Sequence, residues 1–418
     1  MKVCIFEDKT FNNFYPLSLT RPVFELKCGY FTLRERIQNH LEADKICYFM
    51  RDYLAPWFEK HYGLPANKIE QIKNDDMLFV NGRWLIQKDE LELEGEEEVG
   101  LCEGAILYIR VKKETIETYW SENLQDILTK LSKRLKNKKI ESTLIKYPWD
   151  LINHNASQMK KDFIFLGKVG IQGSFPSGSF IVGDQDKVFI APSAEVEPLV
   201  VLNTKSGPIF IDEGAKILSL TRIEGPCYIG KGSQAKGNIR EGTHIGPSCR
   251  VGGGEIEETI IHGFTNKYHE GFIGHSYLGE WVNIGGLTTT SDLKNDYSGV
   301  KIYIDGMLQD SGQTKVGSFI GDHSKMGIGT LLNTGSMVGV GSNVVTGGGI
   351  APKYISSFCW YLSQKFYKGS GLKRTIDMAR EVMKRRGVEL SPEGEKVLEE
   401  VFKITERQRK ESIAKSRR

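Results

Sequence analysis

His275 is the side chain in this sequence best suited to acid–base chemistry. It lies in the segment Gly274–Gly279, which reads Gly-His-Ser-Tyr-Leu-Gly. An imidazole has a pKa close to neutrality, so His275 can accept a proton from a substrate at physiological pH. A lone histidine can equally be a packing or hydrogen-bonding residue. Its role therefore depends on the elements that position it.

A six-residue repeat surrounds His275. Apolar residues of small or medium size return every six positions between Ile209 and Thr346, and glycine often follows them. This period matches neither an amphipathic helix nor an alternating strand, but it is the signature of a parallel β-helix built from hexapeptides. The clearest runs are Ile217, Ile223, Ile229 and Ala235, and then Ile320, Met326, Leu332, Val338 and Val344.

One apolar residue of each hexapeptide is expected to point into the prism, and a following glycine permits a tight corner. His275 stands beside such an anchor, so its ring is expected on the outer face. The alternative fold is a β-sandwich, whose strands would recur every eight to twelve residues. Two interruptions of the repeat, residues 255–271 and 288–314, are expected to leave the coil as loops on a binding face.

The first part of the chain has the rhythm of a Rossmann-like α/β sheet. Val3–Phe6, Ile46–Met50 and Met77–Val80 are short apolar runs that predict buried strands, and Thr32–Leu41 has a helical pattern. In such sheets, ligands bind at the carboxyl ends of the strands. The loops after the first and third of these strands are therefore where chemistry is expected.

Four regions follow from these patterns. Residues 1–111 are expected to form the α/β domain, and residues 112–162 a linker of one or two helices. Residues 163–350 are expected to form the β-helix. Residues 351–418 predict helices that cap the open end of the coil, with Ser391 as an N-cap and a frayed basic tail at the end.

Composition excludes several classes of protein. A net charge of +3 over 418 residues does not indicate nucleic-acid binding. The seven cysteines are scattered and form no Cys-x-x-Cys pair, so reduced thiols in a cytoplasmic protein are expected. The N-terminus lacks a signal-peptide pattern, and no apolar run reaches the length of a membrane span.

The segment from Phe264 to Asn295 resembles the acetyltransferase half of the bifunctional uridylyltransferase/acetyltransferase family GlmU. It is more similar still to the divergent GlmU-like sugar nucleotidyltransferases typical of Bacteroidetes. The strings that carry the resemblance are Phe-Thr-Asn-Lys, Gly-His-Ser-Tyr-Leu-Gly-Glu-Trp-Val-Asn and Ser-Asp-Leu-Lys-Asn. Two departures from GlmU stand out. Tyr277 follows His275 by two residues rather than three, and a coil segment after it is missing.

This resemblance implies a left-handed β-helix and a homotrimer. It implies that His275 takes a proton from a sugar amine as the amine attacks acetyl-CoA, the expected co-substrate. Lys267 would then hold a sugar phosphate, and Tyr277, Asn283 and Asn295 would line the sugar and acetyl sites. The CoA would lie between subunits, along the coils toward residues 327–341.

The segment Tyr15–Pro22 resembles the end of a sugar nucleotidyltransferase signature, but the glycine-rich half of that signature is absent. Where the family has a Gly-Asp whose carboxylate binds magnesium, this chain has Asn81-Gly82-Arg83. A guanidinium in that place inverts the local charge. Binding of Mg²⁺ is possible, but the carboxylate that usually supports it is absent.

Three interpretations of this domain remain open. Arg21, Lys27 and Arg83, with Asn81 beside them, could form a different phosphate site that still transfers a nucleotidyl group. They could bind a nucleotide sugar without turnover, or the domain could be a structural remnant.

The sequence thus predicts a GlmU-like transferase that acts on sugar phosphates or nucleotide sugars. Acetyl-CoA-dependent N-acetylation of an amino sugar-1-phosphate is the preferred reaction, and nucleotidyl transfer in the same chain is a further option. One alternative is a sugar-1-phosphate nucleotidyltransferase whose β-helix is only an oligomerisation scaffold. The other is a non-catalytic scaffold that binds nucleotide sugars.

Overall fold

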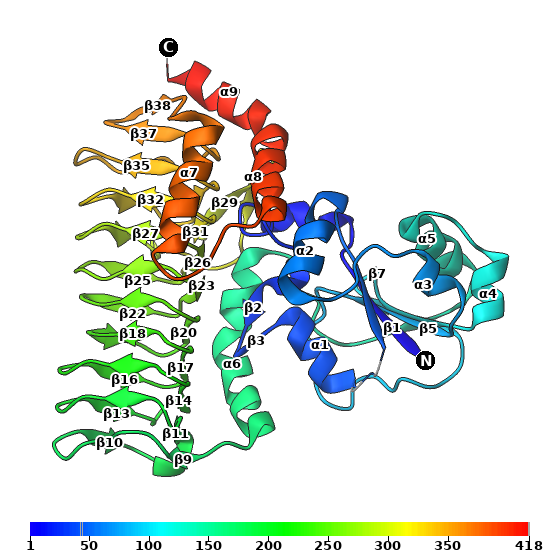
Figure 1. Ribbon diagram of the computed structural model, residues 1–418, viewed down its shortest axis with the longest axis horizontal. Coiled ribbons are helices and arrows are strands. Elements are labelled where there is room, and N and C mark those ends of the chain that lie inside the picture. Colours follow the sequence, from blue (N-terminus) through cyan, green and yellow to red (C-terminus); the bar gives the residue numbers. More distant parts are fainter. Residues whose placement is uncertain (42, 44, 417–418) are drawn as a thin grey trace.

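A computed structural model describes residues 1–416 except 42 and 44, so the last two residues of the expected basic tail lie outside it. The β-helix forms a long column, and the N-terminal domain lies beside it (Figure 1). Helix α6 (Pro148–Leu166) runs along the column between the two, and the chain then enters the column at the end marked by β9. None of the described helices is both long enough and apolar enough to cross a membrane.

The N-terminal domain is a six-stranded mixed sheet in the order β4-β1-β5-β7-β6-β8. Strand β1 pairs in parallel with β4 and β5, whereas β7 is antiparallel to β5 and β6. The predicted α/β domain is therefore confirmed. Its strands are β1 (Lys2–Phe6), β4 (Ile46–Phe49), β5 (Met77–Asn81), β6 (Glu98–Cys102), β7 (Ala105–Val111) and β8 (Lys136–Lys139).

Helices and short connecting elements surround this sheet. The helices are α1 (Leu33–Leu41), α2 (Ala55–Tyr62), α3 (Glu70–Lys73), α4 (Lys113–Thr118) and α5 (Leu124–Arg134). The short elements are the 3-10 helices η1 (Lys9–Phe14), η2 (Val23–Glu25) and η3 (Asp52–Leu54), and the hairpin of β2 (Lys27–Cys28) and β3 (Phe31–Thr32). Because β8 belongs to the sheet, the N-terminal domain extends beyond the boundary expected at residue 111.

The β-helix has three faces, which confirms the predicted prism. Its first face lies toward α6 and carries β9 (Gly170–Ile171), β11 (Val188–Ile190), β14 (Ile209–Ile211), β17 (Cys227–Ile229), β20 (Thr243–Ile245), β23 (Ile260–Gly263), β26 (Tyr277–Glu280), β31 (Phe319–Ile320), β34 (Met337–Val338) and β36 (Tyr354–Ile355).

The second face carries β12 (Glu195–Val196), β15 (Lys216–Ile217), β18 (Gln234–Ala235), β21 (Arg250–Val251), β24 (Asn266–Lys267), β27 (Asn283–Ile284), β32 (Lys325–Met326), β35 (Asn343–Val345), β37 (Trp360–Leu362) and β38 (Lys365–Tyr367). The third face carries β10 (Phe180–Val182), β13 (Val201–Asn203), β16 (Arg222–Glu224), β19 (Asn238–Ile239), β22 (Glu255–Glu257) and β25 (Phe272–Gly274), and then the pair β28 (Thr289–Thr290) and β33 (Leu331–Leu332). A short 3-10 helix, η4 (Gln185–Lys187), precedes β11.

Parallel pairing stacks the repeat anchors inside the prism. Ile217 pairs with Ala235, which pairs in turn with Val251, and all three side chains are buried. Some corners leave no room for a side chain: a Cβ on Gly246 would lie 2.0 Å from the carbonyl oxygen of His262. Strands continue past residue 350 to β37, so the coil is longer than its predicted range.

One of the two predicted insertions is wrong and the other is confirmed. Residues 255–271 form an ordinary coil, in which β22, β23 and β24 pair with the coils on both sides. The loop between β28 and β31 does leave the coil and carries the hairpin of β29 (Lys301–Ile304) and β30 (Met307–Asp310). The repeat is hard to recognise in the first segment because Lys267 occupies a register position that an apolar residue holds in the neighbouring coil.

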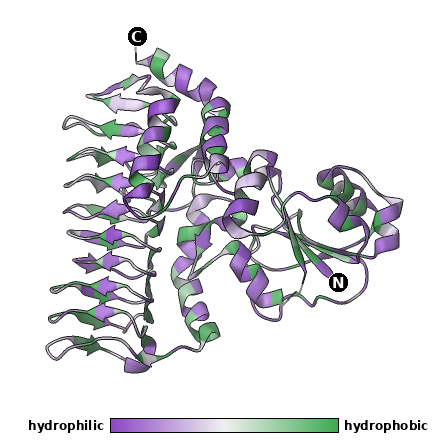
Figure 2. Cartoon of the chain, in the orientation of Figure 1, coloured by the Kyte–Doolittle hydropathy of each residue, from purple (hydrophilic) through white to green (hydrophobic). Residues whose placement is uncertain are grey.

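Three helices follow the coil: α7 (Gly371–Lys384), α8 (Pro392–Ile404) and α9 (Glu406–Lys415). Hydrophobic and hydrophilic residues alternate along α7 and α8, as expected for helices with one buried face (Figure 2). The N-cap is confirmed, because Ser391 Oγ accepts a hydrogen bond from the Gly394 N–H at 3.1 Å. The expected end cap is confirmed only for α9, which contacts β38, the last strand of the coil, whereas α7 lies along the column and α8 packs on α2.

The N-terminal domain and the first face are held together by buried polar contacts. Asn155 on α6 accepts a hydrogen bond from the Gly29 N–H and donates one to the carbonyl of Gly242, each at 2.8 Å. The carbonyl of Gly29 also contacts Nδ1 of His244 at 2.8 Å. The two parts therefore share one interface rather than a flexible linker.

Candidate functional site

Three polar residues form a column along the corner between the third and first faces: Glu258, His275 and Asp292. They lie seventeen residues apart, one coil of this part of the helix each. Nδ1 of His275 lies 2.7 Å from Asp292 Oδ2, and its Nε2 lies 3.2 Å from Glu258 Oε2. We call this set the His275 column. It confirms that a histidine occupies an outer corner of the coil.

The backbone at this corner is left-handed. Glu258 and His275 have φ values of 39° and 44°, in the left-handed region that residues with side chains rarely adopt. Pairing of the coils on each side holds them there, because the His275 N–H donates to the Glu257 carbonyl at 3.1 Å. Leu220 and Leu287, at other corners of the coil, have φ values of 64° and 62°, so this conformation marks a coil corner and does not by itself mark a functional residue.

The two carboxylates control the charge of the imidazole. Burial disfavours the imidazolium, but hydrogen bonds to Asp292 and Glu258 outweigh it and raise the pKa of His275 to about 9. The hydrogen bond to His275 lowers the pKa of Glu258, and it also lowers that of Asp292 against the effect of burial. At neutral pH the histidine is therefore a proton donor, and it becomes a base only after it loses a proton.

Lys267 does not offer its ammonium group to a ligand. It occupies an inward position in the coil and is almost fully buried. Its Nζ donates to the carbonyls of Gly253 and His269 at 2.6 and 2.8 Å, and burial lowers its pKa to about 8. The phosphate-binding role that the resemblance implied for Lys267 is therefore corrected to a structural one.

Tyr277 also has a structural position. Its hydroxyl accepts a hydrogen bond from the Lys27 N–H at 2.9 Å and contacts His262 Nδ1 at 3.0 Å. The ring is fully buried where the first face meets the N-terminal domain, whereas His275 lies at the corner. The sugar- or acetyl-binding role expected for Tyr277 is therefore corrected.

The two predicted asparagines lie on different surfaces. Asn283 accepts a hydrogen bond from Asn266 at 2.9 Å on the second face. Asn295 lies in the inserted loop and lines a cavity of about 600 Å³ beside Lys294 and Asn333. This loop begins just after Asp292, and Asn295 lies three residues beyond that member of the His275 column.

Asp8, Asn81 and Arg83 converge at the carboxyl ends of β1 and β5. Arg83 forms an ion pair with Asp8 through Nη2, and its Nε contacts both oxygens of that carboxylate at 3.1 and 3.2 Å. Asn81 Nδ2 also donates to Asp8 at 2.9 Å. Burial would raise the pKa of Asp8, but the Arg83 contacts lower it. The loops predicted from the sequence do meet here.

A divalent metal does not fit this cluster. Its one carboxylate is already neutralised by a buried guanidinium, and the described residues contain no group of three metal-ligating His, Cys, Asp or Glu side chains. Oxygen ligands with free charge are what Mg²⁺ requires. The cluster is therefore a closed ion pair.

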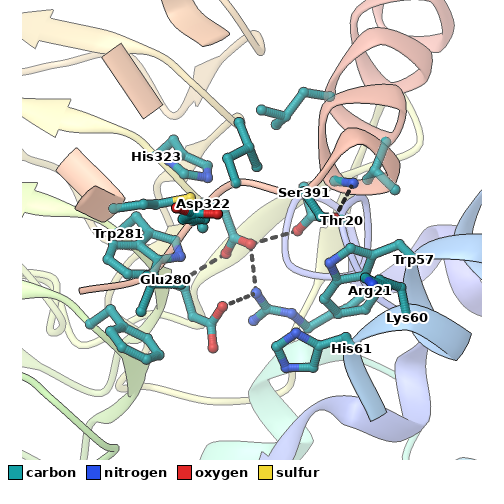
Figure 3. A pocket seen from close by; sticks show the side chains of 18 residues that line it. Thr20, Arg21, Trp57, Lys60, His61, Glu280, Trp281, Asp322, His323 and Ser391 are labelled. Carbon is teal, nitrogen blue, oxygen red and sulfur yellow. Dashed lines mark hydrogen bonds and ion pairs between the residues drawn. The ribbon is translucent and has the colours of Figure 1, made fainter. Parts of the chain in front are cut away.

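Arg21 lies elsewhere, at the junction of all three parts of the chain. Its Nη2 contacts Asp322 Oδ2 at 2.5 Å and Glu280 Oε2 at 3.3 Å, and Thr20 donates to the same Asp322 oxygen at 2.7 Å. Figure 3 shows Arg21 between these carboxylates and the ring of His61. Arg21 and Arg83 therefore belong to different clusters. Burial raises the pKa of Glu280, whereas Arg21 and Lys27 both act to lower it.

Two cavities meet at this junction. The junction cavity, about 310 Å³, is lined by Thr20, Arg21, Trp57, Lys60, His61, Phe264, Glu280, Trp281, Asp322, His323, Met383, Val388, Glu389, Leu390, Ser391, Gly394, Val397 and Leu398 (Figure 3). The cationic cavity, about 450 Å³, is lined by Phe264, Asn266, Trp281, Val282, Asn283, Lys325, Val382, Arg385 and Arg386. Most of these residues carry no motif that sequence analysis recognises.

Coil spacing is the signal that could have found the missed residues. Glu258 and Asp292 lie one coil before and one coil after His275. Likewise, Phe264 and Trp281 are one coil apart and their rings stack with centroids 4.3 Å apart. Stacking of equivalent positions on successive coils is a property of solenoids.

Comparisons with known proteins give a partial match. Residues 3–169 match the family model described as sugar nucleotidyl transferase. A bifunctional sugar-1-phosphate nucleotidylyltransferase/acetyltransferase of Sulfurisphaera tokodaii is 35% identical over 125 residues, which are 29% of this chain and 31% of that protein. The bifunctional protein GlmU of Rippkaea orientalis is 31% identical over 86 residues, which are 20% of this chain and 17% of that protein.

A solved structure, the UDP-N-acetylglucosamine acyltransferase of Francisella novicida, aligns at 16% identity with a TM-score of 0.36, covering 55% of this chain and 77% of that one. The aligned part of the chain spans less than one third of the length of either curated relative.

Proposed function

We propose an acyltransferase activity toward a sugar phosphate for this chain, which is GlmU-like and whose residues 3–169 form a sugar nucleotidyl transferase domain. Acetyl-CoA is the proposed acyl donor, and the amine of an amino sugar-1-phosphate or nucleotide sugar is the proposed acceptor. The observation that carries this proposal is the hydrogen bond between His275 and Asp292.

His275 and Asp292 supply the general base that acylation of an amine needs. Asp292 accepts a hydrogen bond from Nδ1–H of His275, which leaves Nε2 to take the proton of the attacking amine. The amine nitrogen forms a bond to the thioester carbonyl carbon, the carbon–sulfur bond breaks, and the CoA thiolate leaves. The proton on Nε2 can then pass to that thiolate.

Glu258 controls whether His275 can act as a base. Its carboxylate lies 3.2 Å from Nε2, the nitrogen that must receive the proton, and its side chain is 39% exposed. An exposed carboxylate can turn away when an acceptor binds, and the pKa of His275 then falls toward its ordinary value. We therefore assign Glu258 as a positioning residue that keeps the histidine protonated until the acceptor displaces the Glu258 carboxylate. The proton on Nε2 then passes to solvent, and the neutral imidazole can act as the base.

The test is release of CoA thiol from acetyl-CoA with glucosamine-1-phosphate or an amino sugar nucleotide. We expect His275→Gln to lower kcat/KM by about 10²- to 10⁴-fold, the usual contribution of a general base. His154→Gln, on α6, is the matched control and keeps the activity. Equal activity of the native chain and His275→Gln would refute the assignment.

We also propose that the chain is a homotrimer. Four large apolar residues are more than half exposed at the corner between the second and third faces: Leu199, Leu220, Leu287 and Ile328. They form two pairs on successive coils, Leu199 with Leu220 and Leu287 with Ile328, and three coils with polar residues or glycine at this corner separate the pairs. Exposed apolar residues that gather on one face are typical of a protein–protein contact. Light scattering on the native chain and on Leu220→Ser with Ile328→Ser tests it, and a monomeric native chain would overturn it.

A further inference from the structure

The junction cavity and the cationic cavity adjoin, because Phe264 and Trp281 line both. The end of α7 and the segment after it also line both, through Met383 and Val388 in the first and Arg385 and Arg386 in the second. Neither cavity includes a residue of the His275 column. Together they have the volume of an ordinary small-molecule site.

The junction cavity has hydrogen-bonding groups without partners. Arg21 Nη1 and His323 Nδ1 are buried and have no hydrogen-bond partner among the described residues. Both residues line this cavity and are at least nine-tenths buried. Buried polar atoms without partners are costly, so a ligand that offered a hydrogen-bond partner to either atom would gain binding free energy.

The charges of the junction cavity disfavour an anion. Glu280, Asp322 and Glu389 line it together with two cations, Arg21 and Lys60. Carboxylates and an arginine that project between aromatic rings suit a neutral group with many hydroxyls. Trp57 and His61 stack at a centroid distance of 5.0 Å on one side, and Trp281 lies on the other side.

The cationic cavity has the opposite character. Lys325, Arg385 and Arg386 line it, and no carboxylate does. None of these three cations forms an ion pair with another described residue. Lys325 Nζ donates to the Trp281 carbonyl at 2.6 Å and Arg386 Nη1 to the Ser248 carbonyl at 3.1 Å, and each side chain has further N–H groups for a ligand. Burial lowers the pKa of Lys325 to about 8 and lowers that of Arg386, so each positive charge is held at a cost that an anion would offset.

We propose that the two cavities form one binding site for a glycosyl phosphate. The phosphate binds Lys325, Arg385 and Arg386, and the sugar lies between Trp281 and Trp57, where its hydroxyls meet Arg21, Asp322 and His323. A phosphate monoester and the diphosphate of a nucleotide sugar share this chemistry. The site lies apart from the His275 column, so ligand binding does not depend on acyl transfer.

Isothermal titration calorimetry on the full chain tests this site with glucose-1-phosphate and UDP-glucose. Glucose, inorganic phosphate and UMP are the comparison ligands. We expect at least one glycosyl phosphate to bind about tenfold or more tightly than any of the three fragments, because both halves of the site are then used. The tighter of the two glycosyl phosphates shows whether the ligand is a monoester or a nucleotide sugar.

Variants assign the binding to these residues. Arg385→Ala with Arg386→Ala should weaken glycosyl phosphate binding by about 10- to 100-fold, since both phosphate contacts are lost. Lys384→Ala removes a neighbouring exposed cation that lines neither cavity, and it should bind as the native chain does. His323→Phe keeps an aromatic ring but removes Nδ1, and it should weaken binding of the sugar without affecting inorganic phosphate.

The His275→Gln variant separates this proposal from the proposed acyl transfer. Binding should be unchanged in it, even though acyl transfer is lost. Absence of binding by both glycosyl phosphates, binding that the arginine pair does not affect, or equal affinity for inorganic phosphate would each overturn the proposal.

Discussion

The chain contains two polar clusters at positions where sites were expected, and they differ in whether a charged group remains accessible to a ligand. At the carboxyl ends of β1 and β5, the carboxylate of Asp8 is enclosed by Arg83 and Asn81. At the corner of the β-helix, His275 lies between Asp292 and Glu258, and Glu258 is partly exposed. The first cluster is charge-balanced and closed, whereas the second has one cation for two carboxylates.

This difference shows how the same interaction can stabilise one region and prepare another for chemistry. In the Asp8 cluster a permanently charged guanidinium leaves no group that titrates near neutrality. In the His275 column the cation itself titrates, and an exposed carboxylate can release it. Whether the cation can lose its charge, and whether its carboxylate partner is exposed, therefore distinguish a structural cluster from a candidate functional one more clearly than the types of the residues do.

Breaking the closed cluster should have the largest effect. Arg83→Met leaves the carboxylate of Asp8 without its partner, so we expect the free energy of unfolding to fall by about 3–5 kcal/mol. Denaturant unfolding measures it, with Arg134→Met on the exposed face of α5 as the control. Adding Asp8→Asn should restore part of the loss, because no unpaired charge remains. A loss as small as that of the control would contradict the closed ion pair.

The His275 column should make stability depend on pH. The folded-state pKa of His275, about 9, lies above its unfolded value, so protonation stabilises the fold fully below the unfolded pKa. This stabilisation is lost as the pH rises through about 9. With allowance for the exposure of Glu258, we expect about 1–2 kcal/mol. Urea unfolding at pH 6 and pH 10 should show a smaller difference in His275→Gln, and an equal difference would disprove it.

Glu258 should set the pH profile of acyl transfer. Glu258→Gln removes one carboxylate from His275, so the pKa of the histidine should fall, and the rising limb of kcat/KM should move down by about one pH unit. Glu257→Gln, the preceding residue, leaves the column intact and should keep the native profile. An unmoved profile in Glu258→Gln would show that the histidine base is controlled elsewhere.

The fold was largely predictable because apolar periodicity depends on local spacing. The six-residue period predicted the prism, and three apolar runs predicted β1, β4 and β5. It failed at residues 255–271, where Lys267 replaces an apolar anchor and satisfies its ammonium with backbone carbonyls. A charge in an inward position looks like an interruption until the three-dimensional partners are known.

The candidate sites were less predictable because they depend on contacts between distant segments. His275 was identified from the sequence, but its partners Glu258 and Asp292 could be identified only once the length of a coil was known. The junction cavity joins Arg21, Trp281 and Leu398, which lie in three separate parts of the chain. Tyr277 and Lys267 match the family motifs in residue type, but that match did not show that both side chains are buried.

Magnesium should have the smallest effect of all, and this follows from the closed cluster. Arg83 already supplies the positive charge that Asp8 would otherwise take from a metal, so a cation would have to displace a buried guanidinium. We expect millimolar Mg²⁺ or its removal by EDTA to leave the melting temperature unchanged, with no metal-dependent release of pyrophosphate from a nucleoside triphosphate and a sugar phosphate. Stabilisation by Mg²⁺ that disappears in Asp8→Asn would show that the ion pair opens to admit a metal, and the contrast between the two clusters would then fail.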